Sequence, residues 1–337
     1  MADLVGRQLG NYRLIRFLGR GDVAEVYLGE HIPSNNQVAI KVLGIHGGDE
    51  TAFQNAAHAL TQLNHPHILR IVDYGINYPY AFLVMDYLSN GNLRQRHPKG
   101  ETVPLATIVS YVMQVTQALQ YAHSKELFHS NIKPENMLIG SQNAILLGDI
   151  GFATTIETTL DDHVVGLNHY AYRVAGDQYS LGVVVYEWLC GDVPFHGASP
   201  WDILAQHRST SPPSLREKVP TIPPAVEEVV MKALAKDPKD RFVSVQAFAD
   251  ALEHAHLASI RPKVSDRAGQ QFGNYRLIRL LGHGGFADVY LGQHRRLNTY
   301  AAIKVLHTRL SYEDMESFQI KENSPVCASY SSVDWLR

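Results

Sequence analysis

The stretch that decides the fold is residues 127–151, LFHSNIKPENMLIGSQNAILLGDIG. Two short apolar runs, 137–139 and 144–147, are bounded by turn-forming residues, a pattern typical of short buried strands. The polar residues around these predicted strands are His129, Lys133, Asn136 and Asp149. A lysine, an amide and a carboxylate at one edge of a small sheet suit a phosphate chain and its Mg²⁺, because lysine neutralises phosphate charge and the two oxygens bind a hard cation.

This stretch resembles the catalytic loop and metal-binding strand of eukaryotic-type protein kinases, here closest to the bacterial serine/threonine kinases. The family motifs read H-R-D-x-K-x-x-x-N and, further on, D-F-G. His129, Lys133 and Asn136 stand at matching positions, and Asp149-Ile150-Gly151 replaces D-F-G. The resemblance implies that Asn136 and Asp149 bind Mg²⁺. It gives Lys133 a catalytic role and His129 a structural one.

Two departures from the motif bear on catalysis. The arginine of the family motif is Ser130, and its catalytic aspartate is Asn131. An amide oxygen accepts a hydrogen bond but is not a useful base, and losing a general base typically costs about 10²–10⁴ in rate. Phosphoryl transfer also rests on positioning and on charge stabilisation by metal and lysine, so the substitution does not by itself exclude residual activity.

Residues 10–43 alternate apolar and polar around a Gly-rich turn, which predicts a flexible hairpin and a third strand that ends near Lys41. Glycines let the backbone approach phosphates, and a strand lysine about 20 residues later can reach them. The family writes these segments G-x-G-x-x-G-x-V and V-A-I-K, and here the third glycine is Ala24. Together with the hinge strand that the resemblance places at 80–88, the implied ATP-binding residues are Leu18, Gly19, Gly21, Val26, Ala39, Lys41, Met85, Asp86 and Leu88.

Residues 51–63 carry apolar residues at helical spacing and predict an amphipathic helix. In the family this helix carries a glutamate that pairs with the strand lysine, and that position is Ala56 here. The nearest acids, Asp49 and Glu50, precede the predicted helix. The resemblance therefore implies that Lys41 lacks its usual partner.

The rest of the first domain predicts a mostly helical lobe, with a strong helix at 105–124. Asp177 opens the motif D-x-x-S-L-G, which predicts a helix start. The resemblance implies that its carboxylate also accepts backbone N–H bonds from the catalytic loop. The family's A-P-E segment is missing, so its usual partner, Arg241, is expected to be orphaned or solvated.

An internal repeat connects the two ends of the chain. Residues 10–43 align without gaps to 273–306, with 22 of 34 positions identical. The second copy has a Gly-rich hairpin and Lys304 but no catalytic loop, so it cannot form a kinase. We expect a strand hairpin with unpaired edges that packs loosely or variably against the first domain.

These segments predict an α+β, bilobal protein-kinase fold, with a small antiparallel β lobe, a larger and mostly helical lobe, and a partial repeat of the small lobe at the C-terminus. The predicted boundaries are 9–256 for the kinase domain (lobes 9–88 and 89–256), 257–271 for a linker, 272–310 for the truncated second copy and 311–337 for an unrelated or disordered tail.

Composition narrows the range of partners. The net charge of −3 and the pI near 6.6 give no electrostatic reason to expect nucleic acid or an anionic membrane. Two cysteines, and no apolar run of about 20 residues, fit a cytoplasmic protein without a membrane span. The family implies ATP and Mg²⁺, and a protein substrate or a partner kinase.

Three functional hypotheses follow from the kept and lost residues. The first is a serine/threonine protein kinase family member that binds Mg·ATP with phosphotransfer impaired or lost, a pseudokinase scaffold in bacterial signalling. The second is an active but slow serine/threonine kinase. The third is a non-functional truncated duplicate, which the incomplete second copy and the unrelated tail after Phe318 favour.

Overall fold

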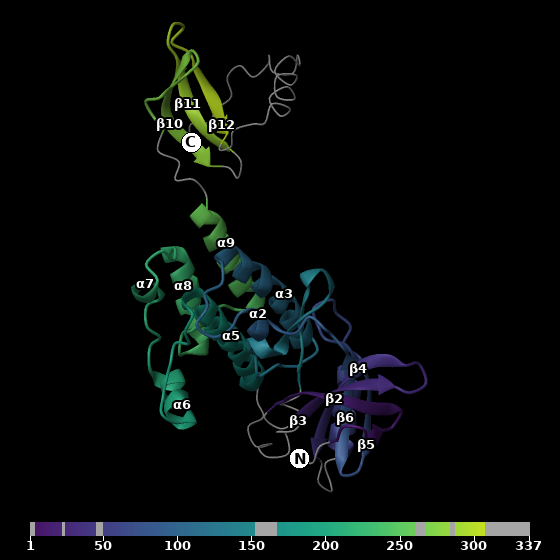
Figure 1. The fold of residues 1–337 in the computed structure, drawn as a ribbon. Coiled ribbons are helices and arrows are strands. Elements are labelled where there is room, and N and C mark those ends of the chain that lie inside the picture. Colours follow the sequence, from purple (N-terminus) through teal and green to yellow (C-terminus); the bar gives the residue numbers. More distant parts are fainter. Residues whose placement is uncertain are drawn as a thin grey trace. The chain divides into compact units, whose positions relative to one another are not determined.

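The computed structural model describes residues 4–21, 24–44, 50–151, 167–260, 267–283 and 287–306. The chain divides into two compact units between Ser259 and Ile260. Figure 1 shows the first unit as two lobes, a β-rich lobe in purple to blue and a helical lobe in teal to green. The tail predicted at 311–337 lies outside the described residues.

The small lobe contains one antiparallel sheet with the strand order β1-β2-β3-β4-β6-β5. Its strands are Gln8–Leu9 (β1), Tyr12–Arg20 (β2), Ala24–His31 (β3), Asn36–Gly44 (β4), Ile71–Asn77 (β5) and Tyr80–Asp86 (β6). Strand β4 lies between β3 and β6 and is buried on both faces from Val38 to Leu43. Because both faces of β4 are buried, its sequence is a nearly continuous apolar run.

The two faces of this sheet pack differently. One face holds a closed apolar cluster that includes Leu14, Tyr27, Ile40 and Val84. Helix α1, Glu50–Thr61, contacts strand β5 and buries Phe53, Ala57 and Leu60. The apolar spacing of the predicted helix therefore marks the face that packs on the sheet.

The large lobe is mostly helical, as predicted. Its elements are α2 (Leu93–Arg96), α3 (Leu105–His123), η1 (Pro134–Asn136), β7 (Met137–Ile139), η2 (Ser141–Asn143), β8 (Ile145–Leu147), α5 (Leu167–Cys190), α6 (Pro200–Ser209), α7 (Leu215–Lys218), α8 (Pro224–Ala233), η3 (Pro238–Asp240) and α9 (Val245–Ile260). The strong helix expected at 105–124 is α3, and the α+β bilobal fold is confirmed. Among the described residues, no helix combines the length and hydropathy that a membrane span requires.

Helix α5 differs from its prediction. The motif at Asp177 predicts a helix start, but α5 begins at Leu167, so Asp177 lies inside the helix. Its carboxylate bonds to the loop before β7 and not to the N-terminus of its own helix. A carboxylate ahead of an apolar run looks the same in sequence whether it caps a helix or supports another segment.

The second unit contains a four-stranded antiparallel sheet with the order β12-β11-β10-β9. The strands are Gln271–Phe272 (β9), Tyr275–His283 (β10), Ala287–His294 (β11) and Tyr300–Leu306 (β12). Its small core is built on Leu277, Tyr290 and Val305. Before it, α9 continues to Ile260 and so occupies the start of the predicted linker.

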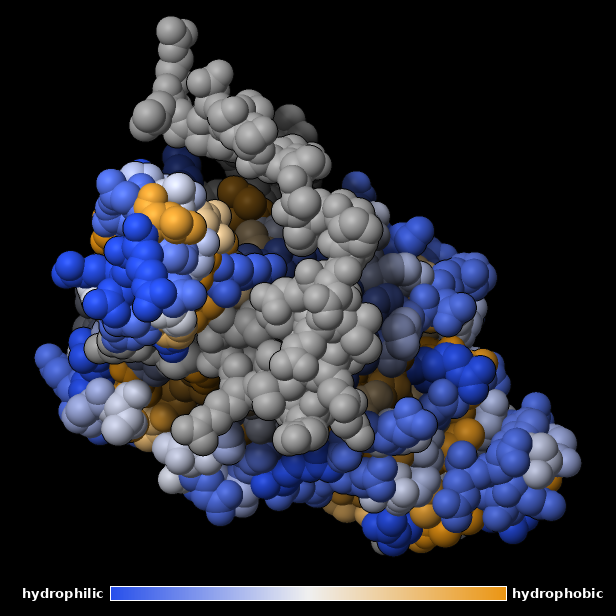
Figure 2. Space-filling model, turned by 90° about the horizontal axis from the view of Figure 1, so that it is seen from above, coloured by the Kyte–Doolittle hydropathy of each residue, from blue (hydrophilic) through white to orange (hydrophobic). Residues whose placement is uncertain are grey.

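Most described residues on the face shown in Figure 2 are hydrophilic, with apolar residues scattered between them. This mixture is normal for a protein surface, because polar side chains are too few to cover a folded chain.

Candidate functional site

The loop at 129–136 is held in place by one buried carboxylate. Asp177 accepts the backbone N–H of His129 at 3.0 Å and that of Ser130 at 2.8 Å. His123 Nε2 lies 2.8 Å from the same carboxylate, and Asp177 is only 1% exposed. Ser130 adopts a left-handed backbone with φ of 61°, a conformation that persists when surrounding bonds fix it. The backbone bonds expected of Asp177 are therefore present.

A hydrogen bond joins two asparagines of this loop. Asn136 Nδ2 donates to the backbone oxygen of Asn131 at 2.9 Å. The bond fixes the orientation of the Asn136 amide and leaves its Oδ1 for another partner. The Asn131 side chain is exposed at the position where the family has its catalytic aspartate.

Strands β7 and β8 bring Asn136 and Asp149 to one edge of a two-stranded ladder. Met137 pairs with Leu147, and the Gly148 N–H donates to the Asn136 carbonyl at 2.8 Å. Asp149 follows directly, with φ of 61° and a partly exposed side chain.

These residues fit Mg²⁺ that arrives with a nucleotide. Within the described ranges, no group of three or more His, Cys, Asp or Glu side chains could hold a metal ion. Asn136 and Asp149 supply two oxygen ligands, and Mg²⁺ at such sites takes its remaining ligands from phosphates and water. Asn136 and Asp149 therefore suit a metal ion that arrives with its phosphates.

Lys41 on β4 joins the small lobe to this edge. Its Nζ lies 2.8 Å from Asp149 Oδ1, and its side chain is 8% exposed. Helix α1 presents Ala56 where the family has a glutamate, so Asp149 takes the place of that counter-ion. One detail of the prediction is wrong: α1 starts at Glu50, so this acid forms part of its first turn.

An apolar pocket lies between the lobes, and Met85 contributes to its lining. Ala39 and Met85 are buried in a cluster against which Val26, Tyr87, Leu88 and Leu138 pack. Neither Tyr87 nor Leu138 was among the predicted binding residues. The sequence does contain a signal for Leu138. It is the middle residue of the predicted strand 137–139, and because side chains alternate along a strand, it points to the face opposite to Met137 and Ile139. Apolar side chains of this kind suit the faces of a flat group such as a purine.

Three further predicted nucleotide residues lie in the hairpin between β2 and β3. In the Gly-rich hairpin, Gly19 pairs with Val26, Leu18 is half-buried, and the Gly21 N–H donates to the Ala24 carbonyl at 2.8 Å.

The hinge residue Asp86 has its carboxylate already occupied. Arg70 binds it through two nitrogens, at 2.9 and 3.0 Å. The Asp86 carboxylate is therefore occupied, and the hinge would bind the adenine of a nucleotide through its backbone groups.

An arginine that the sequence did not reveal ties the loop to two helices. Arg94 on α2 contacts Glu135 of the loop at 2.9 Å and Glu187 of α5 at 2.6 and 2.9 Å. These carboxylates, Glu187 foremost, raise the pKa of Arg94. Glu135 lies between Lys133 and Asn136, so the bond helps to set the position of both.

Arg241 is neither orphaned nor solvated, which corrects the prediction. Its guanidinium donates to the backbone carbonyls of Ala175 at 2.7 Å, Ala235 at 2.8 Å and Lys236 at 3.3 Å. It also lies 4.7 Å from the ring centroid of Tyr179. Backbone carbonyls accept the hydrogen bonds of the Arg241 guanidinium, and the ring face adds a favourable contact, so no carboxylate is needed. A comparison of sequence motifs does not reveal such partners.

Because His129 is buried in the loop, we expect the stability of the folded protein to decrease in acid. Burial lowers the pKa of His129, so the folded protein keeps this ring neutral. An unfolded histidine binds a proton below about pH 6.5, so each such group lowers stability by up to about 1.4 kcal/mol per pH unit below that value. We expect the Tm to fall between about pH 7.5 and 5.5, and to fall less in His129→Asn. Equal falls in both proteins, measured by thermal unfolding, would contradict this role of His129.

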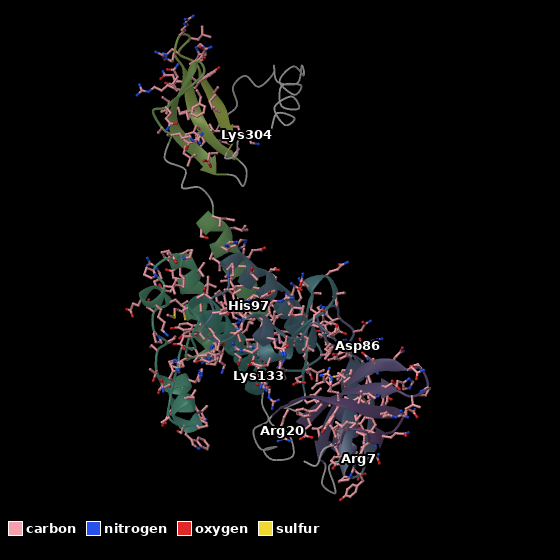
Figure 3. All side chains as sticks on the ribbon, in the orientation of Figure 1. Arg7, Arg20, Asp86, His97, Lys133 and Lys304 are labelled. Atoms are coloured by element: carbon pink, nitrogen blue, oxygen red, sulfur yellow. The ribbon has the colours of Figure 1, made fainter. Side chains whose placement is uncertain are left out.

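Together these residues place a lysine, a carboxylate and an amide oxygen beside an apolar pocket. Figure 3 labels Lys133 on the loop of the large lobe. Such a site can bind a nucleoside triphosphate with Mg²⁺, and it has an amide where a proton acceptor would be needed.

Comparison with known proteins agrees with this geometry. A family model described as "Protein kinase domain" matches residues 12–256. The chain is 31% identical over 260 residues to the serine/threonine-protein kinase PrkC of Bacillus subtilis, covering 72% of this chain and 40% of that protein. It is 34% identical over 274 residues to PknF of Mycobacterium tuberculosis, covering 74% and 57%.

The chain thus spans about two fifths to three fifths of the length of these relatives. Among solved structures, a crystal structure of Rad53 in complex with AMP-PNP matches with a TM-score of 0.61 and 22% identity, over 72% of this chain and 64% of that one. A likeness at this identity shows the fold.

Proposed function

Because the chain belongs to the bacterial serine/threonine branch of the protein kinase family, we propose that its first unit binds Mg·ATP and transfers the phosphate poorly or not at all. In this proposal the protein acts as a pseudokinase scaffold, and its partner is a protein substrate or another kinase. A cytoplasmic location remains a prediction from cysteine usage.

One observation carries the proposal. Asn131 is exposed on a loop that hydrogen bonds to Asp177 and from Asn136 hold in place, and its amide cannot act as a base. The binding residues Lys41, Asn136 and Asp149 are kept in the same site. A site that retains its binding groups and loses its proton acceptor favours binding over turnover.

Nucleotide binding requires one exchange of contacts. Lys41 and Asp149 hold each other at 2.8 Å in the structure. Lys41 would bind the phosphates in place of Asp149, and Asp149 together with Asn136 would hold the Mg²⁺. The metal would supply positive charge that neutralises the phosphates.

The retained Lys133, Asn136 and Asp149 also favour the second hypothesis, a slow kinase. In that case wild-type protein transfers phosphate, and replacing Asn131 by aspartate raises the rate only modestly. The third hypothesis, a duplicate without function, expects no nucleotide binding and poor solubility.

The apolar pocket offers a direct test of binding. We expect Ala39→Trp to weaken Mg·ATP binding by about 100-fold or more, because the indole fills the space beside Met85 and Leu138. Titration calorimetry measures this. The matched control is Ala302→Trp, at the same position of the repeat, where the side chain is exposed and binding should not change. Equal binding by wild type and Ala39→Trp would rule out this pocket, and no binding by wild type would overturn the proposal.

A further inference from the structure

The second unit ends its sheet on a strand that copies a central strand of the first unit. Strand β12 pairs with β11, and within the described residues no other strand lies beside it. Its counterpart β4 pairs on one side with β3 and on the other with β6, from Val38 opposite Asp86 to Gly44 opposite Tyr80. An edge strand of this kind presents a row of backbone donors and acceptors to which a further strand can pair.

The side chains on the core face show what such a strand would supply. In the first unit, Ile40 and Val42 are fully buried, and β6 places Val84 and Phe82 opposite them in the same cluster. Their counterparts, Ile303 and Val305, lie in a smaller cluster in which Ile303 is only partly buried. An aromatic and a branched side chain at alternate positions would complete this core.

The opposite face of β12 carries a basic side chain. Lys304 lies opposite Val289, and Ala302 lies opposite Leu291, which itself lies opposite Arg279. Lys304 and Arg279 therefore share the face that points away from the core, and both are exposed.

The second unit as a whole carries the same sign of charge. Its described residues 267–283 and 287–306 contain six Lys and Arg against one acid, the buried Asp288. The chain as a whole has a net charge of −3. A second copy of this basic sheet would be repelled, whereas a strand with carboxylates on one face would be attracted.

We propose that the β12 edge is a docking site for an extended acidic segment of a partner protein, which adds to the sheet as a further antiparallel strand. The partner segment alternates large apolar residues, which cover Ile303 and Val305, with carboxylates beside Lys304. Backbone hydrogen bonds provide the affinity, and the alternation fixes the register, because a slip by one residue would turn every side chain to the wrong face.

A synthetic peptide tests this with the full chain. The probe has the sequence Tyr-Glu-Phe-Glu-Val-Glu-Asp, which is β6 with glutamate at each position that faces away from the core. The control, Tyr-Phe-Val-Glu-Glu-Glu-Asp, has the same composition with Phe and Val adjacent, so that they point to opposite faces in any register. We expect fluorescence anisotropy to show saturable binding of the probe and at least ~10-fold weaker binding of the control.

Two variants separate local docking from general attraction. Lys304→Glu should weaken probe binding by about 5- to 10-fold, since like charges then face each other across the strand pair. Arg296→Glu makes the same change of charge at an exposed position outside the strands and should have little effect. Equal losses in both variants, or no binding of the probe, would overturn the proposal.

Hydrogen exchange gives an independent readout. Bound probe should slow exchange of the backbone amides of β12 and leave those of β9, at the other edge of the sheet, unchanged. Uniform protection across the sheet, or protection of β9 alone, would place the peptide elsewhere and contradict the assignment of β12.

Discussion

Asn131→Asp should raise phosphoryl transfer from Mg·ATP by about 100-fold or more over wild type, because general-base catalysis is typically worth 10²–10⁴ in rate. The structure favours a large gain, since the loop that carries residue 131 is already fixed by Asp177 and by Asn136. The new carboxylate would enter a site whose metal ligands and lysine are in place. Intact mass measures incorporated phosphate, on the protein itself and on a generic basic substrate.

Lys41→Met is the control for this experiment, because it removes the lysine that reaches the phosphates and should abolish transfer in the Asn131→Asp background. Wild-type transfer that depends on Lys41 and equals that of Asn131→Asp would show that the protein is an active kinase and that Asn131 does not impair it. Silence in every variant would mean that Ala56 in α1 and the missing A-P-E segment matter as much as Asn131. Nucleotide binding would then separate a scaffold from a non-functional duplicate.

The features that the sequence predicts well are those fixed by local pattern. Period-two alternation and Gly-rich turns locate the strands of the small lobe, and helical spacing locates α3. The site residues come from short motifs whose spacing is set by the strand pair β7–β8, so Asn136 and Asp149 fall at one edge, as expected. The repeat predicts β10 to β12 in the same way, because the same residues form the same hairpin.

Side-chain contacts between distant parts of the chain cannot be predicted from a local sequence pattern. The Arg241 guanidinium donates hydrogen bonds to three backbone carbonyls, one on α5 and two on the segment that follows α8. These hydrogen bonds form only because the two segments pack together. Lys41 pairs with Asp149, more than a hundred residues later, in place of the glutamate that α1 lacks. Arg94 joins two acids from distant segments for the same reason. Each contact follows from tertiary packing, which the sequence constrains only through the whole fold.

Asp177→Ala should destabilise the first unit by about 3–5 kcal/mol, the largest stability effect that we expect from one substitution in the described residues. The buried carboxylate accepts the N–H groups of His129 and Ser130 and contacts His123. Alanine leaves two backbone donors without their partner and leaves a void beside a buried ring. For a domain of this size the Tm should fall by roughly 10 °C, which differential scanning calorimetry measures.

The choice of replacement separates support of the loop from simple loss of packing. Asp177→Asn keeps the volume and one acceptor oxygen, but turns an amide NH₂ toward a donor, so it should recover only part of the lost stability. Asp250→Ala, on α9 and bonded only to a neighbouring glutamine within the described residues, is the matched control and should change the Tm little. If Asp177→Ala melted like wild type, the loop would be held by Arg94 and Glu135 and not by Asp177. If it melted early yet bound Mg·ATP normally, the loop would not need its fixed geometry to bind nucleotide.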